Sequence, residues 1–102
     1  IITLMRVDLH NHSNYSDGIL SPTELVRMAC SAGCDLFSLT DHDTTNGIVE
    51  AKHMADKLGL NLINGVEISA FWRNSAVHIL GLGIDIENDM LQEGLMFNQT
   101  LR

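Results

Sequence analysis

The sequence predicts an α/β fold in which parallel strands alternate with helices. Short apolar stretches typical of buried strands recur along the chain, and two of them are followed by segments whose apolar residues repeat with helical spacing. Histidine and carboxylate side chains gather at or near the ends of these stretches. Because parallel α/β folds collect functional groups at the carboxyl ends of their strands, the pattern predicts one shared site.

The first strand is expected over residues 5–12. Period-two alternation in this segment places Asp8, His10 and His12 on the same face. One strand end therefore presents two imidazoles together. The polar loop that follows carries Asp17, a further candidate for the site.

A helix is expected to begin at Ser21. Ser21 can cap it, Pro22 suits its first position, and Glu24 completes a capping box three residues after the cap. Gly33 suits its end. This helix is expected to cover the first strand.

The same order of elements then repeats. A second strand over residues 36–40 leads directly to His42, and a second amphipathic helix follows over residues 48–58. A third strand over residues 61–70 carries Glu67 on the face toward which the histidines point. The repeat predicts that these side chains reach one edge of the sheet.

The last third of the chain departs from this alternation. Residues 71–75 are expected to form a loop too short for a helix, before a fourth strand over residues 77–82 with His78 near its start. Asn88 can cap a last helix, in which Gly94 is a weak point. Four parallel strands with helices on one side would leave an open half-barrel with an unpaired edge. We therefore expect either further chain or self-association of this open half-barrel.

Composition places the chain among ordinary globular domains. It has 102 residues, of which 45% are hydrophobic and 19% charged. No run of about 18 apolar residues occurs, so we expect no membrane contact and a cytoplasmic location. Cys30 and Cys34 fit small buried residues of a reducing compartment. The net charge of −7 disfavours a purely electrostatic grip on nucleic acid, but bound divalent cations would offset it and hold an anionic substrate.

The histidines and carboxylates have the character of metal ligands. His10 and His12, spaced as His-x-His on a strand, can deliver two nitrogens to one divalent ion, and Glu67 adds a carboxylate. A glutamate can bridge two ions, so Glu67 can also serve a second ion together with His78. The two remaining side chains can serve a third position. The predicted ligands are His10, His12, Asp17, His42, Glu67 and His78. Clusters of divalent ions favour phosphoester hydrolysis.

Most of the other polar residues have two possible interpretations. Asp8 either orients a ligand imidazole through a hydrogen bond or pairs within the strand layer. Asp43 either caps its loop and the following helix or faces the site. His53, in the middle of the second helix, is expected on the solvated surface. Three residues are candidates for the rim, where they would either pack or contact a nucleotide by stacking and phosphate binding: Tyr15, Trp72 and Arg73.

These residues together resemble the motifs of the PHP (polymerase and histidinol phosphatase) family. The resemblance covers nearly the whole chain and rests on the order and spacing of five segments: Asp8-Leu9-His10-Asn11-His12-Ser13, Ser16-Asp17-Gly18, Thr40-Asp41-His42-Asp43-Thr44, Gly65-Val66-Glu67-Ile68-Ser69 and His78-Ile79-Leu80-Gly81. Asp17 stands where several other branches carry histidine. In this the chain is most similar to the 3′,5′-nucleoside bisphosphate phosphatase branch, whose members also trim RNA 5′ ends.

The resemblance implies a distorted (β/α)7 barrel with parallel strands, outer helices and a trinuclear metal site, of which residues 1–102 would be the N-terminal part of a single domain. It also implies three ion positions: His10, His12 and Glu67; Glu67 and His78; Asp17 and His42. The family pattern includes a later histidine and a final Asp-x-His, which the residues after His78 do not supply.

The activity implied by the resemblance is hydrolysis of the 3′-phosphate of nucleoside 3′,5′-bisphosphates by metal-activated water, with 5′-3′ exoribonuclease action on short RNA. Mn²⁺ is the expected cofactor, with Fe²⁺ and Zn²⁺ as alternatives. The expected partners are thus small phosphorylated nucleotides or short RNA. The alternatives are another activity of the family, either histidinol phosphatase or polymerase-associated exonuclease, and an inactive structural or binding module.

Overall fold

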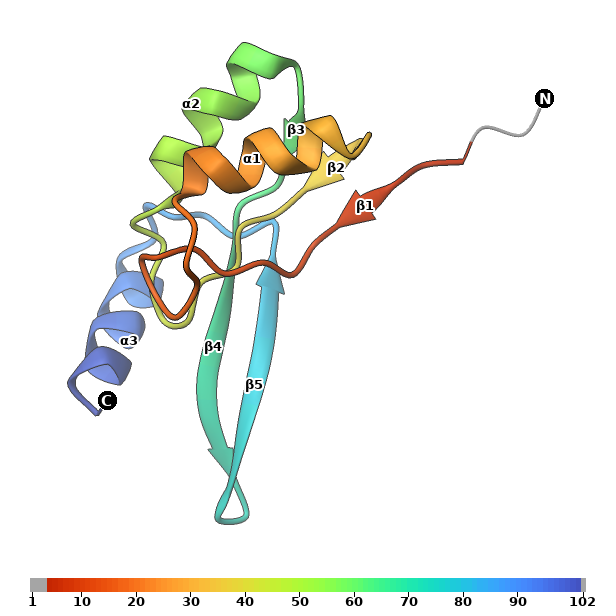
Figure 1. Cartoon of the computed structure of the whole chain (residues 1–102). Helices are drawn as coiled ribbons and strands as arrows, with labels where there is room; N and C mark the ends of the chain where they lie inside the picture. Colours follow the sequence, from red (N-terminus) through yellow and green to blue (C-terminus); the bar gives the residue numbers. More distant parts are fainter. Residues whose placement is uncertain (1–3, 102) are drawn as a thin grey trace.

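The computed structural model describes residues 4–101. Its elements are β1 (Val7–Asp8), α1 (Pro22–Ser31), β2 (Leu36–Phe37), α2 (Ile48–Leu58), β3 (Asn61–Leu62), β4 (Gly65–Trp72), β5 (Ser75–Leu82) and α3 (Asp89–Thr100). The strands form a parallel sheet in the order β1-β2-β3 and a separate hairpin of β4 and β5 (Figure 1).

The parallel sheet and its two helices confirm the predicted α/β class. Leu36 of β2 aligns with Val7 of β1 on one side and with Asn61 of β3 on the other. Helix α1 begins as expected, because the Ser21 side chain accepts a hydrogen bond from the Glu24 backbone N–H while the Glu24 side chain bonds back to the cap. Helix α1 connects β1 to β2, and α2 connects β2 to β3. Parallel neighbours need such a crossover, because a tight turn joins only antiparallel strands.

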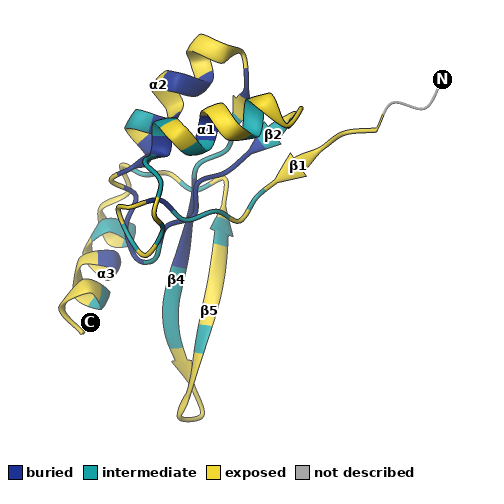
Figure 2. Cartoon of the chain, in the orientation of Figure 1, coloured by how far each residue is buried: buried dark blue, intermediate teal, exposed yellow. Residues whose placement is uncertain are grey.

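The core lies between the two helices and β2. Its buried members are Val26, Phe37, Leu39, Ala51, Met54, Ala55 and Leu60. Figure 2 shows the buried residues concentrated there and in the first part of β4, whereas the far end of the hairpin is exposed. Cys30 and Cys34 are half-buried beside this core rather than fully buried, and Cys34 donates through its sulfur to the Leu36 carbonyl at 3.1 Å.

The prediction of a fourth parallel strand is wrong. β4 and β5 pair antiparallel along their whole length, from Gly65 opposite Leu82 to the turn. The turn residues Arg73 and Asn74 have φ angles of 50° and 67°, typical of tight two-residue hairpin turns. A link this short joins only antiparallel strands, since a parallel crossover needs about a dozen residues.

Four predicted boundaries also differ. The strands expected over residues 5–12 and 36–40 contain only Val7–Asp8 and Leu36–Phe37, so His10 and His12 lie after β1 and not within it. The strand expected over residues 61–70 is divided into β3 and β4, and most of the loop expected over residues 71–75 belongs to the hairpin strands. The hairpin is joined to the rest of the fold by an isolated parallel bridge between His42 and Glu67. This bridge places the start of β4 directly beside the loop that follows β2.

Helix α3 lies against the hairpin and begins as predicted. The Asn88 side chain accepts a hydrogen bond from the Leu91 backbone N–H at 2.9 Å, and Leu95 is buried. Met90 and Phe97 of the same helix are mostly exposed, which fits the expected open side of the fold. Over residues 4–101, the helices are too short or too polar to cross a bilayer.

Candidate metal centre

All six predicted ligand side chains meet at one place. They come from the segment after β1 (His10, His12 and Asp17), the loop after β2 (His42), β4 (Glu67) and β5 (His78). Their ligand atoms form three overlapping groups, in each of which the atoms lie within 4.8 Å of one another: His10, His12 and Glu67; His12, Asp17 and His42; His42, Glu67 and His78. The antiparallel hairpin therefore brings His78 to the same site that a parallel strand was expected to supply.

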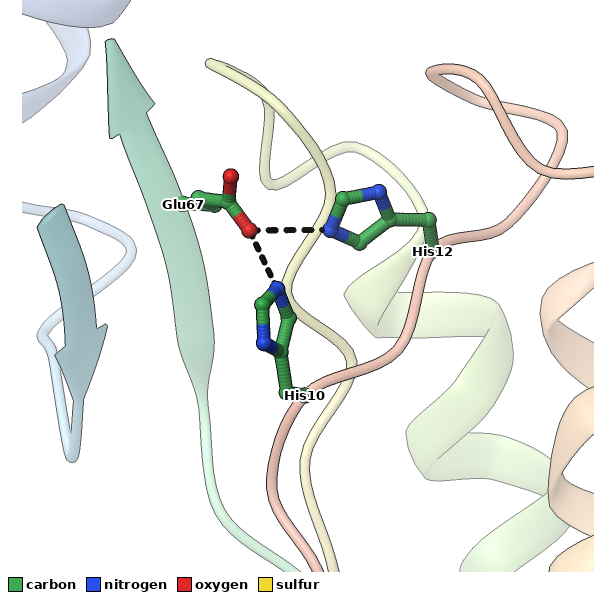
Figure 3. A group of neighbouring side chains, drawn as sticks. All are labelled: His10, His12 and Glu67. Atoms are coloured by element: carbon green, nitrogen blue, oxygen red, sulfur yellow. Dashed lines mark hydrogen bonds and ion pairs between the residues drawn. The ribbon is translucent and has the colours of Figure 1, made fainter. Parts of the chain in front are cut away.

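Glu67 lies at the centre of this cluster. Its Oε1 contacts Nε2 of both His10 and His12, the latter at 3.0 Å (Figure 3). Its Oε2 lies 2.8 Å from Nδ1 of His78 and 3.4 Å from Nδ1 of His42. The residue is only 4% exposed. One buried carboxylate thus presents one oxygen to each of two pairs of imidazoles.

Asp17 forms a second, more exposed corner. Its Oδ1 lies 2.7 Å from Nδ1 of His12, and its Oδ2 lies 3.2 Å from Nε2 of His42. The two histidines therefore stand between the carboxylates of Asp17 and Glu67, with one ring nitrogen toward each.

The contacts shift the titration of three of these groups. Burial alone would lower the pKa of His12, but its hydrogen bonds with Asp17 and Glu67 outweigh burial and raise the pKa above its ordinary value. The hydrogen bond with His12 lowers the pKa of Asp17. For Glu67, burial acts to raise the pKa, but the hydrogen bonds with His10 and His12 prevail and lower it. The carboxylates are therefore held ionised, as cation ligands must be.

The donor set fits divalent cations. Nδ1 of His42 is buried and makes no hydrogen bond with any residue in the range 4–101. Such an atom costs about 1–3 kcal/mol unless another group satisfies it, and a cation held with Glu67 and His78 would do so, as an alternative to a cation at Nε2 beside Asp17. A neutral imidazole has one lone pair, so each ring serves one ion. Since His12 and His42 each occur in two groups, the six side chains cannot give three ions three ligands each.

Comparison with known proteins decides the family. The family model for the PHP domain matches residues 8–93. The chain belongs to the PHP domain family. It is 45% identical over 97 residues to a 5′-3′ exoribonuclease of Haemophilus influenzae, covering 95% of this chain and 35% of that protein. It is 46% identical over 92 residues to a 3′,5′-nucleoside bisphosphate phosphatase of Chromobacterium violaceum, covering 90% of this chain and 32% of that protein.

Solved structures agree with this placement. An amidohydrolase from Chromobacterium violaceum, with bound sulfate and no metal, superposes with a TM-score of 0.88 at 46% identity, covering 90% of this chain and 32% of that chain. A Bifidobacterium adolescentis protein, provisionally described as a metal-dependent phosphoesterase, gives a TM-score of 0.91 at 32% identity, covering 98% and 35%. The chain thus spans about a third of the length of these PHP relatives.

A buried carboxylate that the sequence analysis did not single out shapes the loop that carries Asp17. Asp41 is 1% exposed and accepts hydrogen bonds from the Ser13 backbone N–H at 2.6 Å, the Ser13 hydroxyl at 2.7 Å and the Ser16 hydroxyl at 2.9 Å. At the end of the same loop, Gly18 approaches His12 so closely that a Cβ there would lie 2.1 Å from the His12 carbonyl oxygen. Only glycine fits this close approach. The polar run after His12 is therefore a fixed ligand loop of this PHP chain.

Asp8 and Asp43 both lie beside the ligands without bonding an imidazole ring in any described contact. Oδ1 of Asp8 accepts a hydrogen bond from the Asn11 side chain at 2.7 Å and a long one from the His10 backbone N–H at 3.5 Å. This favours local pairing over orientation of an imidazole. Oδ1 of Asp43 accepts from the Ser69 backbone N–H at 2.9 Å, so Asp43 bonds β4.

The three rim candidates separate in the structure. Tyr15 lines a pocket of about 410 Å³ together with Asp17 and His42. Trp72 and Arg73 instead lie at the far end of the hairpin, where the guanidinium carbon stands 5.3 Å from the Trp72 ring centroid (Figure 1). Only Tyr15 of the three is thus placed beside the ligand cluster, while the mid-helix His53 is exposed as expected.

Proposed function

We propose that this chain forms the ligand-bearing part of a metal-dependent phosphoesterase that removes the 3′-phosphate from nucleoside 3′,5′-bisphosphates and acts on short RNA as a 5′-3′ exoribonuclease. The observation that carries the proposal is the convergence of four imidazoles on the two oxygens of buried Glu67. The activities for which the relatives at 45% and 46% identity are named supply the substrate class.

In the proposed site His10, His12 and Glu67 would hold one ion, Glu67 and His78 a second, and Asp17 and His42 a third. When bound, such ions supply Lewis acidity and lower the pKa of bound water to about 7. The chain's own residues contribute the orientation of the ligand side chains.

The second ring nitrogen of His12 shows how this orientation works. A hydrogen bond from Nδ1–H of His12 to Asp17 leaves the lone pair of Nε2 facing Glu67, which is the arrangement that ligand imidazoles generally adopt. Glu67 is buried and His12 is half-buried, which restricts the movement of the carboxylate and of the His12 ring. The proposed centre is therefore preorganised for cations.

The proposed activity belongs to the complete protein. We propose that residues 1–102 are the N-terminal part of a single PHP domain, in which later segments supply the remaining ligands of the family pattern and the groups that bind phosphate. The share of each relative covered, 32–35%, supports this.

Phosphate release from adenosine 3′,5′-bisphosphate by the complete protein tests the proposal, measured with and without a chelator. Restoration of the activity by added Mn²⁺ is the expected result. Equal rates with and without chelator would remove the metal mechanism. Faster turnover of histidinol phosphate, or removal of nucleotides from DNA 3′ ends, would favour another PHP activity. Metal content without any hydrolysis would favour a binding module.

The donor set does not select among Mn²⁺, Fe²⁺ and Zn²⁺. The cluster combines imidazole nitrogens with carboxylate oxygens and contains no thiolate, a combination that all three ions accept. Elemental analysis of protein purified without added metal decides among them. The cytoplasmic location and the self-association of the open side stay predictions.

A further inference from the structure

The loop that carries His42 is held in place by the residue after it. Asp43 is fully buried and has a φ of 53°, a conformation that is uncommon for residues other than glycine. Its backbone N–H donates to the Glu67 carbonyl at 2.9 Å, and the Glu67 N–H donates to the Asp41 carbonyl at 3.0 Å. These two bonds form the parallel bridge that sets His42 opposite Glu67.

The Asp43 side chain forms the next hydrogen bond of this parallel ladder, at the point where the Asp43 backbone turns away from β4. In a regular parallel ladder the Ser69 N–H would bond to the Asp43 carbonyl. In this fold the Ser69 N–H bonds instead to Oδ1 of Asp43, at 2.9 Å, while the Asp43 carbonyl accepts from the Gln99 side chain at 2.7 Å. The carboxylate thus replaces a backbone carbonyl, and the chain can turn away immediately after His42 without losing its bond to β4.

Helix α3 contacts the same point. The Asn98 amide group donates to Oδ1 of Asp43 at 3.0 Å and to the Ser69 carbonyl at 2.9 Å. Together with the Gln99 bond to the Asp43 carbonyl, these contacts join α3, the loop after β2 and β4 at one buried residue, Asp43. Because Asp43 directly follows His42 in the chain, a displacement of Asp43 acts on His42 through the backbone.

We propose that Asp43 is a positioning residue of the metal centre, which fixes the His42 ring relative to Glu67 by standing in for a strand carbonyl and which couples helix α3 to the site. The proposal rests on the proposed metal site, and it assigns Asp43 an effect on those ions that need His42. Residues His10 and His12 reach Glu67 from another segment, so the ion they would hold depends on Asp43 only through Glu67.

Two substitutions separate positioning from simple loss of charge. Asp43→Asn keeps the Oδ1 acceptor for Ser69 and Asn98, and asparagine tolerates a positive φ well. Asp43→Ala removes the acceptor. We expect Asp43→Ala to weaken the binding of ions that depend on His42 on the order of tenfold or more, and Asp43→Asn to restore it.

A remote variant controls for destabilisation. Glu50 of α2 accepts hydrogen bonds from the Thr23 backbone N–H at 3.1 Å and the Thr23 hydroxyl at 2.9 Å, and so ties α1 to α2 outside the cluster. Glu50→Ala should lower the unfolding midpoint while leaving ion binding unchanged.

The experiment uses the complete protein in two measurements. Co²⁺ titration followed by visible absorption separates the ions bound first from those bound later. Histidine ring resonances, recorded by NMR on metal-free protein, report the His42 environment without any ion. We expect Asp43→Ala to move the His42 resonances, leave those of His10 nearly unchanged, and weaken only part of the Co²⁺ binding.

Each failure has a separate signature. If wild-type protein binds no Co²⁺, the proposed function fails, while the metal-free resonances still test Asp43. If Asp43→Ala leaves the His42 resonances and every Co²⁺ step unchanged, or if Glu50→Ala weakens Co²⁺ binding equally, the positioning role is overturned.

Discussion

Nδ1 of His12 lies 2.7 Å from Oδ1 of Asp17. An ionised carboxylate only accepts hydrogen bonds, so Asp17 accepts one from Nδ1–H of His12. The other nitrogen, Nε2, faces Glu67 at 3.0 Å, where it would offer its lone pair to an ion held between the two residues. Asp17 is therefore both a candidate ligand and the group that prepares His12.

Substitution Asp17→Asn tests this relationship directly. Since the hydrogen bond and charge of Asp17 both raise the pKa of His12, we expect the variant to lower that pKa in metal-free protein. NMR titration of the His12 ring measures it. Asp56→Asn is the control, because it removes an equal charge from an exposed pair with Lys52. A His12 titration that is unchanged in Asp17→Asn, or shifted as much by the control, would contradict the assignment.

The stability of the metal-free protein should depend on pH through the same cluster. The pKa of His12 is raised above 6.5, so its contribution is present below pH 6.5 and is lost as the pH rises through the raised value. The pKa values of Asp17 and Glu67 are lowered from 3.8 and 4.5, so their contributions are present above those values and are lost as the pH falls through the lowered ones. The cluster therefore stabilises the fold most between pH 4.5 and 6.5.

Urea unfolding of chelator-treated protein over this range provides the measurement. We expect Glu67→Gln to flatten the profile on both sides, because the glutamine neither titrates nor forms ion pairs. A profile with the same curvature in wild type and variant would place the pH dependence elsewhere.

That the candidate ligands gather at one place was predictable from the sequence, because the patterns that put them near strand ends are local. A short apolar run marks the strand before His42, whereas His10 and His12 lie after β1 and not within the strand that alternation predicted. The direction of the last strand could not be predicted in this way, because period-two alternation is the same in parallel and antiparallel strands. Arg73-Asn74 is also a weaker turn signal than Asn-Gly, although both residues adopt positive φ.

The groups that hold the ligands were harder to foresee. Asp41 bonds Ser13 and Ser16, which lie 28 and 25 residues away, so its role depends on how the loop folds back. The replacement of a ladder carbonyl by Asp43 depends on one φ angle, which no periodicity encodes. Sequence patterns thus indicate which side chains gather, whereas the turns between elements decide what fixes them.

Removal of the central carboxylate should affect more than one ion position. Glu67→Gln keeps the size of the side chain but removes its charge and replaces one oxygen with an NH2 group, which does not bind cations. Because both oxygens of Glu67 face imidazole pairs, we expect the affinity for divalent ions to fall by at least about 100-fold, the upper range for groups that only support a ligand. Isothermal titration with Mn²⁺ measures this, and Glu50→Gln is the control of equal charge. Tight binding retained in Glu67→Gln would mean that the ions lie elsewhere.

Two glycine substitutions should act in opposite directions. Gly18→Ala would place a Cβ 2.1 Å from the His12 carbonyl oxygen, so the loop that carries Asp17 must move. We expect a loss of about 1–3 kcal/mol in the free energy of unfolding together with weaker ion binding. Gly94→Ala meets no atom within 4 Å inside α3 and should stabilise the protein by about 1 kcal/mol, since alanine favours helix.

Urea unfolding and Mn²⁺ titration of the two glycine variants complete this comparison. If Gly18→Ala lowers stability but leaves Mn²⁺ binding intact, the loop can relax without displacing His12 or Asp17, and the close approach at Gly18 serves only folding. If binding falls while Gly94→Ala leaves it unchanged, the loss arises from displacement of the ligand loop. A general effect of replacing glycine would weaken binding in both variants.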